Sequence, residues 1–361
     1  MSDSYGKNLT VTVFGESHGA GIGVVVDGLR PGIAVSEAEI ARQMARRAPG
    51  GHLGTTRREA DRVEILSGVF NGYTCGTSVC GLIRNQNAQS SDYEQLALLP
   101  RPSHADYPAH VKYRGFEDYR GGGHFSGRLT APLVFAGALC RMALADRGIA
   151  VGSHILQLHS LTERPFAADD LGEERLADLS AEALPLLEPA NRPQLEACIE
   201  QACAEGDSVG GVVETAVTGL PAGLGDPLFD SMESRLAQIL FSVPAVKGLS
   251  FGSGFALAGM KGSEANDAYE LRDDRIVTAT NHNGGILGGI TNGMPVVFRT
   301  VLKPTPSIAK PQRTVNLTEG REETLRITGR HDPCIIPRAI PVLEACAMIA
   351  VYDAWKEAGL E

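Results

Sequence analysis

The sequence predicts an α+β protein in which sheets pack against helices. Helical and strand-like patterns are interspersed along the chain but do not alternate regularly, which argues against a doubly wound parallel sheet. No linker, low-complexity tract or tandem repeat divides the pattern. We therefore expect residues 1–361 to form a single domain, with the acidic segment 160–207 as a candidate variable outer lobe.

The individual elements follow from periodicity and from boundary residues. Ser36 and Glu39 form a capping-box signature before one helix, and Gly148 follows the end of another. Apolar spacing predicts helices over 38–47, 131–146, 192–205, 227–241 and 337–358. Apolar or alternating runs bounded by Gly, Pro or Asn predict strands over 9–14, 23–27, 211–218, 276–280 and 295–302. Residues 50–62 and 85–130 show little periodicity and are expected to be loops that are either functional or mobile.

Composition excludes several classes of protein. The 361 residues are 43% hydrophobic and 21% charged, as in a folded globular protein, and a net charge of −10 argues against bulk binding to nucleic acid or an anionic membrane. The seven cysteines are an odd number without a C-x-x-C pair, which indicates free thiols in a reducing cytoplasm. We expect no signal peptide and, without a run of about 18 apolar residues, no membrane span.

One short motif predicts the wrong chemistry if it is taken alone. Residues 15–19, Gly-Glu-Ser-His-Gly, match the G-x-S-x-G elbow of serine hydrolases, which needs a strand before the serine and a helix after it. Residues 20–27 instead predict a second strand, so a Ser17 nucleophile is the less favoured alternative. His18 is the residue of interest, because flanking glycines leave its imidazole open to a ligand and histidine transfers protons near neutral pH. A merely solvated turn histidine remains the other interpretation.

Two further histidines lie in polar, glycine-rich surroundings. His104 belongs to Arg-Pro-Ser-His-Ala-Asp-Tyr at 101–107, and His124 follows three glycines just before a predicted helix near Thr130. Backbone N–H groups and the helix dipole there favour an anion, although a flexible turn has the same sequence pattern. Neither a Walker loop nor a dinucleotide-binding glycine motif occurs.

Charge and loop chemistry indicate a small anionic ligand. From 42 to 128 the chain has 12 basic and 8 acidic residues, against an acidic remainder, although solvated surface arginines would look the same. Lys303 with two hydroxyls on a proline-stiffened loop is suited to phosphate, and Asp332 is either a base or a helix-capping acid. The glycine run 284–289 permits close approach of a flat ligand. A metal site is not expected, because the adjacent His331 and Asp332 would rarely ligate together.

Taken in order, these segments resemble one family. The ordered segments are Gly-Glu-Ser-His-Gly (15–19), Arg-Pro-Ser-His-Ala-Asp-Tyr (101–107), Asp-Tyr-Arg-Gly-Gly-Gly (118–123), Gly-Gly-Ile-Leu-Gly-Gly-Ile (284–290), Lys-Pro-Thr (303–305) and Gly-Arg-His-Asp-Pro-Cys (329–334). Together they are similar to chorismate synthases over nearly the whole chain. The resemblance implies a β-α-β sandwich with helices between antiparallel sheets, a cytoplasmic homotetramer, and reduced FMN (FMNH2) as cofactor. It implies 1,4-anti elimination of phosphate from 5-enolpyruvylshikimate 3-phosphate, giving chorismate.

The resemblance also implies residue roles. His18 would protonate the departing phosphate, and His104 would stabilise the reduced flavin at its N1/C2 carbonyl edge. Asp332 would assist proton removal from C6 of the substrate, relayed through flavin N5. The implied flavin contacts are His124, Phe125, Ser126, Pro244, Ala245, Gly288, Lys303, Pro304, Thr305, Pro306, Ser307 and Arg330. The implied cations for the substrate are Arg47, Arg57, Arg128 and Arg338.

The chain departs from the family pattern at two places. Many members have a third arginine where Ala48 stands, and many have Arg-Ser where His124 and Phe125 stand. His124, Arg57 or Arg58 are the candidates to compensate. No added reductase module is found, so an external flavin reductant is expected in place of a built-in NADPH-dependent activity. A serine hydrolase and a catalytically silent FMN-binding protein remain the alternatives.

Overall fold

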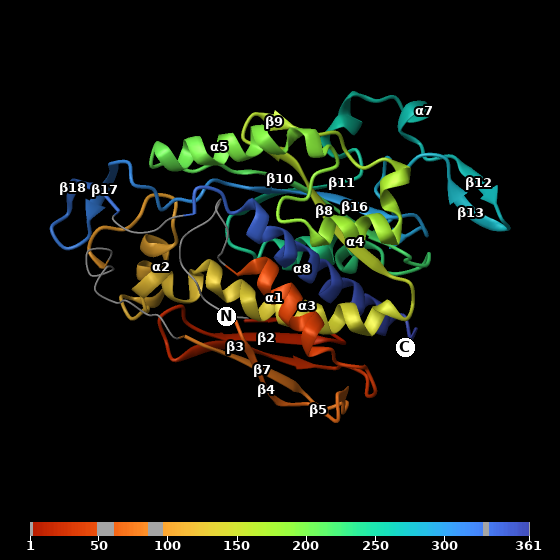
Figure 1. Cartoon of the computed structure of the whole chain (residues 1–361), viewed down its shortest axis with the longest axis horizontal. Coiled ribbons are helices and arrows are strands. Elements are labelled where there is room, and N and C mark those ends of the chain that lie inside the picture. Colours follow the sequence, from red (N-terminus) through yellow and green to blue (C-terminus); the bar gives the residue numbers. More distant parts are fainter. Residues whose placement is uncertain (1–2, 49–60, 86–96, 328–331, 361) are drawn as a thin grey trace.

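A layer of helices lies between two antiparallel sheets in the computed structural model (Figure 1). The structure describes residues 3–48, 61–85, 97–327 and 332–360. The first sheet has the strand order β1-β2-β3-β7-β4, with bounds Ser4–Tyr5, Thr10–Gly15, Gly21–Asp27, Val79–Arg84 and Val63–Ser67. The second has the order β11-β16-β10-β8-β9, with bounds Val246–Phe251, Val296–Leu302, Gly211–Thr218, Ala150–Leu158 and Leu161–Thr162. The predicted sandwich is therefore confirmed.

The central helices explain why the core needs so few aromatic residues. They are α1 (Glu37–Arg47), α3 (Thr130–Ala145), α6 (Met232–Leu240) and α8 (Ile336–Glu357). Every residue of α8 from 339 to 355 is buried, because the helix contacts α1, α3, α6 and the second sheet. A helix enclosed on all sides must be apolar all round, and Ala and branched side chains allow its neighbours to approach closely.

The two sheets differ in how they are covered. In the first sheet β7 alternates between buried and half-exposed residues, which is the pattern of a sheet with one face toward the core and one toward solvent. In the second sheet residues 151–155 and 213–217 are continuously buried. Its inner face packs on α8 and its outer face is covered by α4 (Glu173–Ala181), with Leu176 and Leu179 in the contact. Helix α4 belongs to the segment 160–207 that was predicted as an outer lobe, and the same segment contains α5 (Arg192–Ala204).

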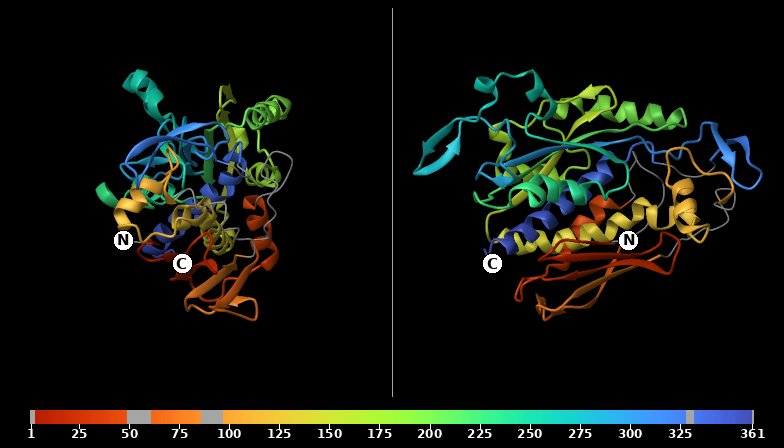
Figure 2. Two further views of the ribbon diagram at one scale, coloured as in Figure 1. Left: turned by 90° about the vertical axis from the view of Figure 1, so that its left-hand side faces the viewer. Right: turned by 180° about the vertical axis from the view of Figure 1, so that it is seen from behind.

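Smaller elements extend from both ends of the sandwich (Figure 2). The hairpin of β12 (Tyr269–Arg272) and β13 (Arg275–Thr278) projects from one end, and that of β17 (Gln312–Asn316) and β18 (Arg321–Leu325) from the other. The remaining elements are β5 (Val69–Phe70), β6 (Tyr73–Thr74), β14 (Ile286–Leu287), β15 (Ile290–Thr291), α2 (Asp106–Tyr113) and α7 (Gly262–Ala265), with short 3-10 turns that include η2 (Arg120–Phe125) and η3 (Gly127–Leu129).

Asp353 on α8 ties down the start of the chain. Its Oδ1 accepts backbone hydrogen bonds from Lys7, Asn8 and Leu9 at 3.0, 2.7 and 2.8 Å. Its Oδ2 is paired with Arg235 of α6 at 3.0 Å. The carboxylate is only 2% exposed, so these partners replace the water that it has lost. The short strand β1 is thereby attached to the last helix.

Several predictions from sequence need correction. The segment 85–130 is not all loop, since it contains α2. The predicted helix 227–241 begins only at Met232, because Ser231 is extended and caps the helix through a 3.0 Å bond from Ser234 N–H. Strands β7 and β8 and helix α4 were not predicted.

One helix bears on the expectation that no segment spans a membrane. Within the described ranges, the stretch Gly127–Ala145 has the length and apolar composition of a membrane span. However, 78% of its most apolar window is buried inside the protein, so its place in the helical layer accounts for that composition. All seven cysteines are free thiols.

Candidate active site

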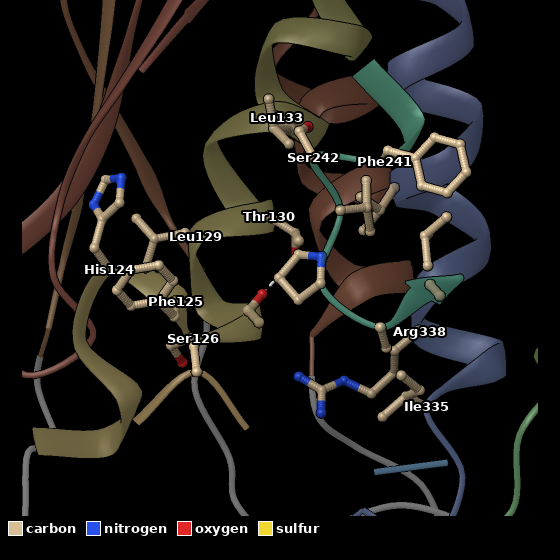
Figure 3. Close-up of a pocket in the computed structure, with 18 of the residues that line it drawn as sticks. His124, Phe125, Ser126, Leu129, Thr130, Leu133, Phe241, Ser242, Ile335 and Arg338 are labelled. Carbon is tan, nitrogen blue, oxygen red and sulfur yellow. Dashed lines mark hydrogen bonds between the residues drawn. The ribbon is translucent and has the colours of Figure 1, made fainter. Parts of the chain in front are cut away.

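A pocket of about 860 Å³ opens where α3 and α8 begin and α1 and α6 end. This volume lies in the range of roughly 300–1,000 Å³ typical of small-molecule sites. Figure 3 shows Phe125 and Ser126 on one side, Arg338 and Ile335 of the α8 end on the other, and Thr130 between them. The candidate residues that line it are Arg47, His104, His124, Phe125, Ser126, Pro244, Ala245, Lys303, Thr305, Pro306, Ser307, Asp332 and Arg338.

Three successive glycines place two histidines beside the pocket. Gly121, Gly122 and Gly123 have φ of +58°, +82° and +52°, a path that other residues rarely follow. A Cβ at Gly121 would lie 2.1 Å from Cε1 of His18, and one at Gly122 would lie 3.3 Å from Nε2 of His104. The loop therefore separates the two imidazoles by little more than a bare backbone.

His18 is fixed by its neighbours, but it does not line the pocket itself. It is 5% exposed, and its Nδ1 lies 2.9 Å from Oγ of the preceding Ser17. Gly121, which contacts its ring, does line the pocket. The residues after it form strand β3 rather than the helix that a nucleophile elbow requires, so the serine-hydrolase geometry is not formed.

His104 belongs to a buried charged cluster. Its Nδ1 lies 2.6 Å from Oδ1 of Asp106, the first residue of α2. Arg101 donates from Nε and Nη2 to the two Asp106 oxygens, both at 2.8 Å, and from Nη1 to Ser307 Oγ at 3.3 Å. Burial alone would raise the pKa of Asp106, but the hydrogen bonds from Arg101 and His104 outweigh it and lower the pKa well below its usual range. Sequence reasoning quoted this motif but gave Arg101 and Asp106 no role.

Two candidate cations share one buried carboxylate. Asp61 is paired with Arg47 and, at 2.8 Å, with Nη1 of Arg128. Arg47 also donates to Thr130 Oγ1 at 3.1 Å and to the Gly127 carbonyl at 3.2 Å. Burial lowers the pKa of Arg47 to about 10, although Asp61 opposes the shift. Asp61 was not foreseen, because only the fold brings 47, 61 and 128 together.

Asp332 and Arg338 form an ion pair at the start of α8. Both line the pocket, and Nε of Arg338 donates to the Arg47 carbonyl at 3.1 Å. The candidate base and a candidate substrate cation are thus partners before any ligand is bound. The ion pair with Asp332 fixes the orientation of the Arg338 guanidinium. The ion pairs with Asp61 do the same for Arg47 and Arg128.

The loop after β16 forms the opposite wall. Lys303 donates through its backbone N–H to the Ala245 carbonyl at 2.9 Å, where Ala245 has a φ of +75°. Burial and repulsion from Lys247 lower the pKa of Lys303. Oγ1 of Thr305 is buried and has no hydrogen-bond partner among the residues that the structure describes. A buried hydroxyl without a partner is costly, which is consistent with a polar ligand group bound there.

Not every candidate residue reaches this pocket. Pro304 and Arg128 are not among its lining residues, and Gly288 lies in the β14–β15 turn, whose Gly289 carbonyl accepts from Met232 at the far end of α6. Arg57, Arg58 and Arg330 lie outside the residues that the structure describes.

The residues at the two departures have different surroundings. His124 donates from Nδ1 to the Gly15 carbonyl at 2.8 Å, and its Nε2 lies 3.4 Å from Asp3. Phe125 packs near Tyr113, with ring centroids 6.1 Å apart. Arg46 is turned toward α8, where it is paired with Glu344 at 2.6 Å. Of residues 46–48, only Arg47 therefore lines the pocket.

Comparisons with known proteins decide the family. The family model described as "Chorismate synthase" matches residues 9–355. The chain belongs to the chorismate synthase family. A chorismate synthase of Dehalococcoides mccartyi is 45% identical over 100% of this chain and 98% of its own length. One from Thermococcus gammatolerans is 48% identical over 96% of each chain.

A solved structure agrees with this assignment. The structure titled "Crystal Structure of Chorismate Synthase" superposes with a TM-score of 0.76 and 28% identity, covering 98% of this chain and 93% of that one. As a chorismate synthase, the enzyme is a lyase of the shikimate pathway that eliminates phosphate from 5-enolpyruvylshikimate 3-phosphate to give chorismate. The pocket suits such a substrate, because Arg47, Arg338 and Lys303 surround it with positive charge.

Proposed function

We propose that the enzyme works with reduced FMN bound in the pocket, and that His18, His104 and Asp332 are its catalytic residues. The supporting observation is the convergence of distant segments on one pocket: 101–105, 121–130, 303–307 and 332–342 all line it. We also propose a cytoplasmic homotetramer that depends on an external flavin reductant, such as an NADPH-dependent reductase.

The residues present fit a flavin. Leu129, Leu133, Phe241 and Ile335 supply apolar side chains around the pocket for a flat ring system. Thr305, whose buried Oγ1 has no hydrogen-bond partner among the described residues, is also in the lining. Ser126, Ser307 and Lys303 would hold the cofactor's polar groups. When bound, the reduced flavin supplies electron density to the substrate ring as phosphate leaves.

The protein's own groups orient the substrate and move protons. Arg47 and Arg338 bind the substrate anions, and the helix dipole at the start of α3 adds to the positive field. His18 donates a proton to the departing phosphate. Asp332, oriented by Arg338, assists removal of the C6 proton, and His104 would stabilise the negative charge of the reduced cofactor.

The proposal is tested by an anaerobic assay. Protein, reduced FMN and substrate should release phosphate and form chorismate, and absence of both products would reject it. His18→Ala and His104→Ala should each lower turnover roughly 10²-fold or more, and Asp332→Asn should slow proton loss. His159→Asn serves as the control, because His159 is exposed, lies outside the pocket, and has a φ of 52° that Asn tolerates. Near-wild-type rates in the first two variants would remove their assigned roles.

A further inference from the structure

We propose that Asp106 is a positioning residue for this reaction, which holds the proton of His104 on Nδ1 and thereby leaves Nε2 for the ligand in the pocket. The inference rests on the proposed role of His104. Asp106 does not line the large pocket, so it acts through His104 rather than on the substrate or the cofactor.

The carboxylate of Asp106 is almost completely surrounded by donors. Its Oδ2 accepts from the backbone N–H of Arg101 at 2.9 Å and from Nε at 2.8 Å. Its Oδ1 accepts from Arg101 Nη2 at 2.8 Å and faces His104 Nδ1 at 2.6 Å. The side chain is 9% exposed, so water contributes little to this arrangement. All four contacts come from residues 101 and 104, which precede α2 by a few positions.

These contacts fix the tautomer of His104. An ionised carboxylate can only accept hydrogen bonds, so a contact of 2.6 Å requires the imidazole proton to be on Nδ1. Nη2 of Arg101 also lies 3.1 Å from Nδ1, but both atoms are then donors and this second contact is not a hydrogen bond. Nε2 is left as the nitrogen that takes up a second proton, and the imidazolium formed in this way, with both ring nitrogens protonated, is the form that stabilises negative charge in the pocket.

The same cluster fixes the direction of the ring. Gly122 backs the imidazole, since a Cβ there would approach Cε1 to 3.1 Å. Arg101 extends the cluster to Ser307 on the opposite wall of the pocket. Replacement of Asp106 by Asn would leave one acceptor oxygen. The backbone N–H and Nε of Arg101 would retain it, so the amide NH₂ would face Nδ1 and favour the opposite tautomer.

The decisive experiment compares Asp106→Asn with Asp170→Asn. Asp170 is the matched control: it accepts from Arg164 at 2.5 and 3.0 Å and from the Ala167 N–H at 2.8 Å, but it lies outside the pocket. Nitrogen-15 NMR of the imidazole of His104, assigned by its loss in His104→Ala, is recorded on flavin-free protein. We expect an Nδ1–H tautomer in wild type and in Asp170→Asn, and an Nε2–H tautomer in Asp106→Asn.

Kinetics give the second readout. Asp106→Asn should lower kcat by roughly 10²- to 10⁴-fold with little change in KM, as expected for a histidine held in the wrong tautomer, while Asp170→Asn keeps its kcat. An Nε2–H tautomer in the wild-type protein would overturn the inference even if Asp106→Asn does not fold. Wild-type kcat in a folded Asp106→Asn would also overturn it. Absence of wild-type turnover would count against the proposed function instead, since the NMR result does not depend on activity.

Discussion

The molecule contains two buried clusters of the same composition, a histidine, a carboxylate and an arginine. One is Arg101 and His104, in the turn before α2, with Asp106, the first residue of α2. The other is in the second sheet, where Nε2 of His154 lies 3.0 Å from Glu214 and Nε of Arg299 donates to Glu214 at 2.8 Å. Only the first borders the large pocket.

The difference lies in the backbone that carries each cluster. His154, Glu214 and Arg299 are direct cross-strand partners on β8, β10 and β16, so strand register alone brings them together. His154 is completely buried and Glu214 is 1% exposed. The pocket cluster instead depends on a turn and on glycines at positive φ. The same three residue types therefore stabilise the sheet in one place and serve the ligand in the other.

The largest expected effect is on stability, at the sheet cluster. Glu214→Gln removes the carboxylate that pairs with Nε2 of the buried His154 and with Arg299, and should reduce the free energy of unfolding by about 3–5 kcal/mol. Denaturant unfolding measures this loss. The turnover of the remaining folded enzyme should be unchanged, and a large fall in kcat at unchanged stability would contradict the division between the two clusters.

A change of similar size is expected for activity, at the glycine loop. In Gly121→Ala the new Cβ would collide with the His18 ring and with Ser17 Oγ, which lies 2.8 Å from its ideal position. Displacement of His18 should lower turnover roughly 10²-fold. Gly148→Ala is the matched control, because Gly148 also has a positive φ, +69°, but an added Cβ meets nothing within 4 Å. An equal loss of activity in both variants would mean that backbone strain at a positive φ, and not contact with His18, lowers the turnover.

The smallest expected effect concerns the difference in stability between the wild-type protein and Glu214→Gln, which should depend on pH. Burial would raise the pKa of Glu214, but bonds from His154, Phe166 N–H and Arg299 lower it below its ordinary value of 4.5. Because the folded pKa is the lower one, the stabilisation is fully present above about pH 4.5 and is lost as the pH falls through the folded pKa. The gap in stability between wild type and Glu214→Gln should therefore narrow below that pH. A stability difference that widens on acidification would show that folding raises the pKa of Glu214 instead of lowering it.

Local signals predicted local structure well. Strand β10 has the bounds Gly211–Thr218 that its apolar run predicts, and Ser36 caps α1 by accepting from Glu39 N–H at 3.2 Å. The second strand after Ser17 was also predicted, which made the serine hydrolase the less favoured alternative. These features depend on neighbours in sequence, so one chain suffices to predict them.

Features that depend on distant partners were not predicted. Helix α2 has weak amphipathicity and carries a proline, so its own sequence pattern does not predict it. In β8, Gly152 is required where Leu176 of α4 packs closely, and it obscures the strand pattern. Asp61 gained a role only through contacts with Arg47 and Arg128. The candidate residues themselves came from motif resemblance, and their hydrogen-bond partners came from the fold.

The attachment of β1 to α8 through Asp353 has a consequence for biosynthesis. Asp3, Ser4 and Tyr5 line the pocket, but the carboxylate that holds the residues just after them is 344 positions from Leu9. During translation, the part of the pocket formed by these N-terminal residues cannot reach its final structure until nearly the whole polypeptide has left the ribosome. A nascent chain lacking α8 would therefore be unable to bind ligand, and the site matures only after synthesis is almost finished.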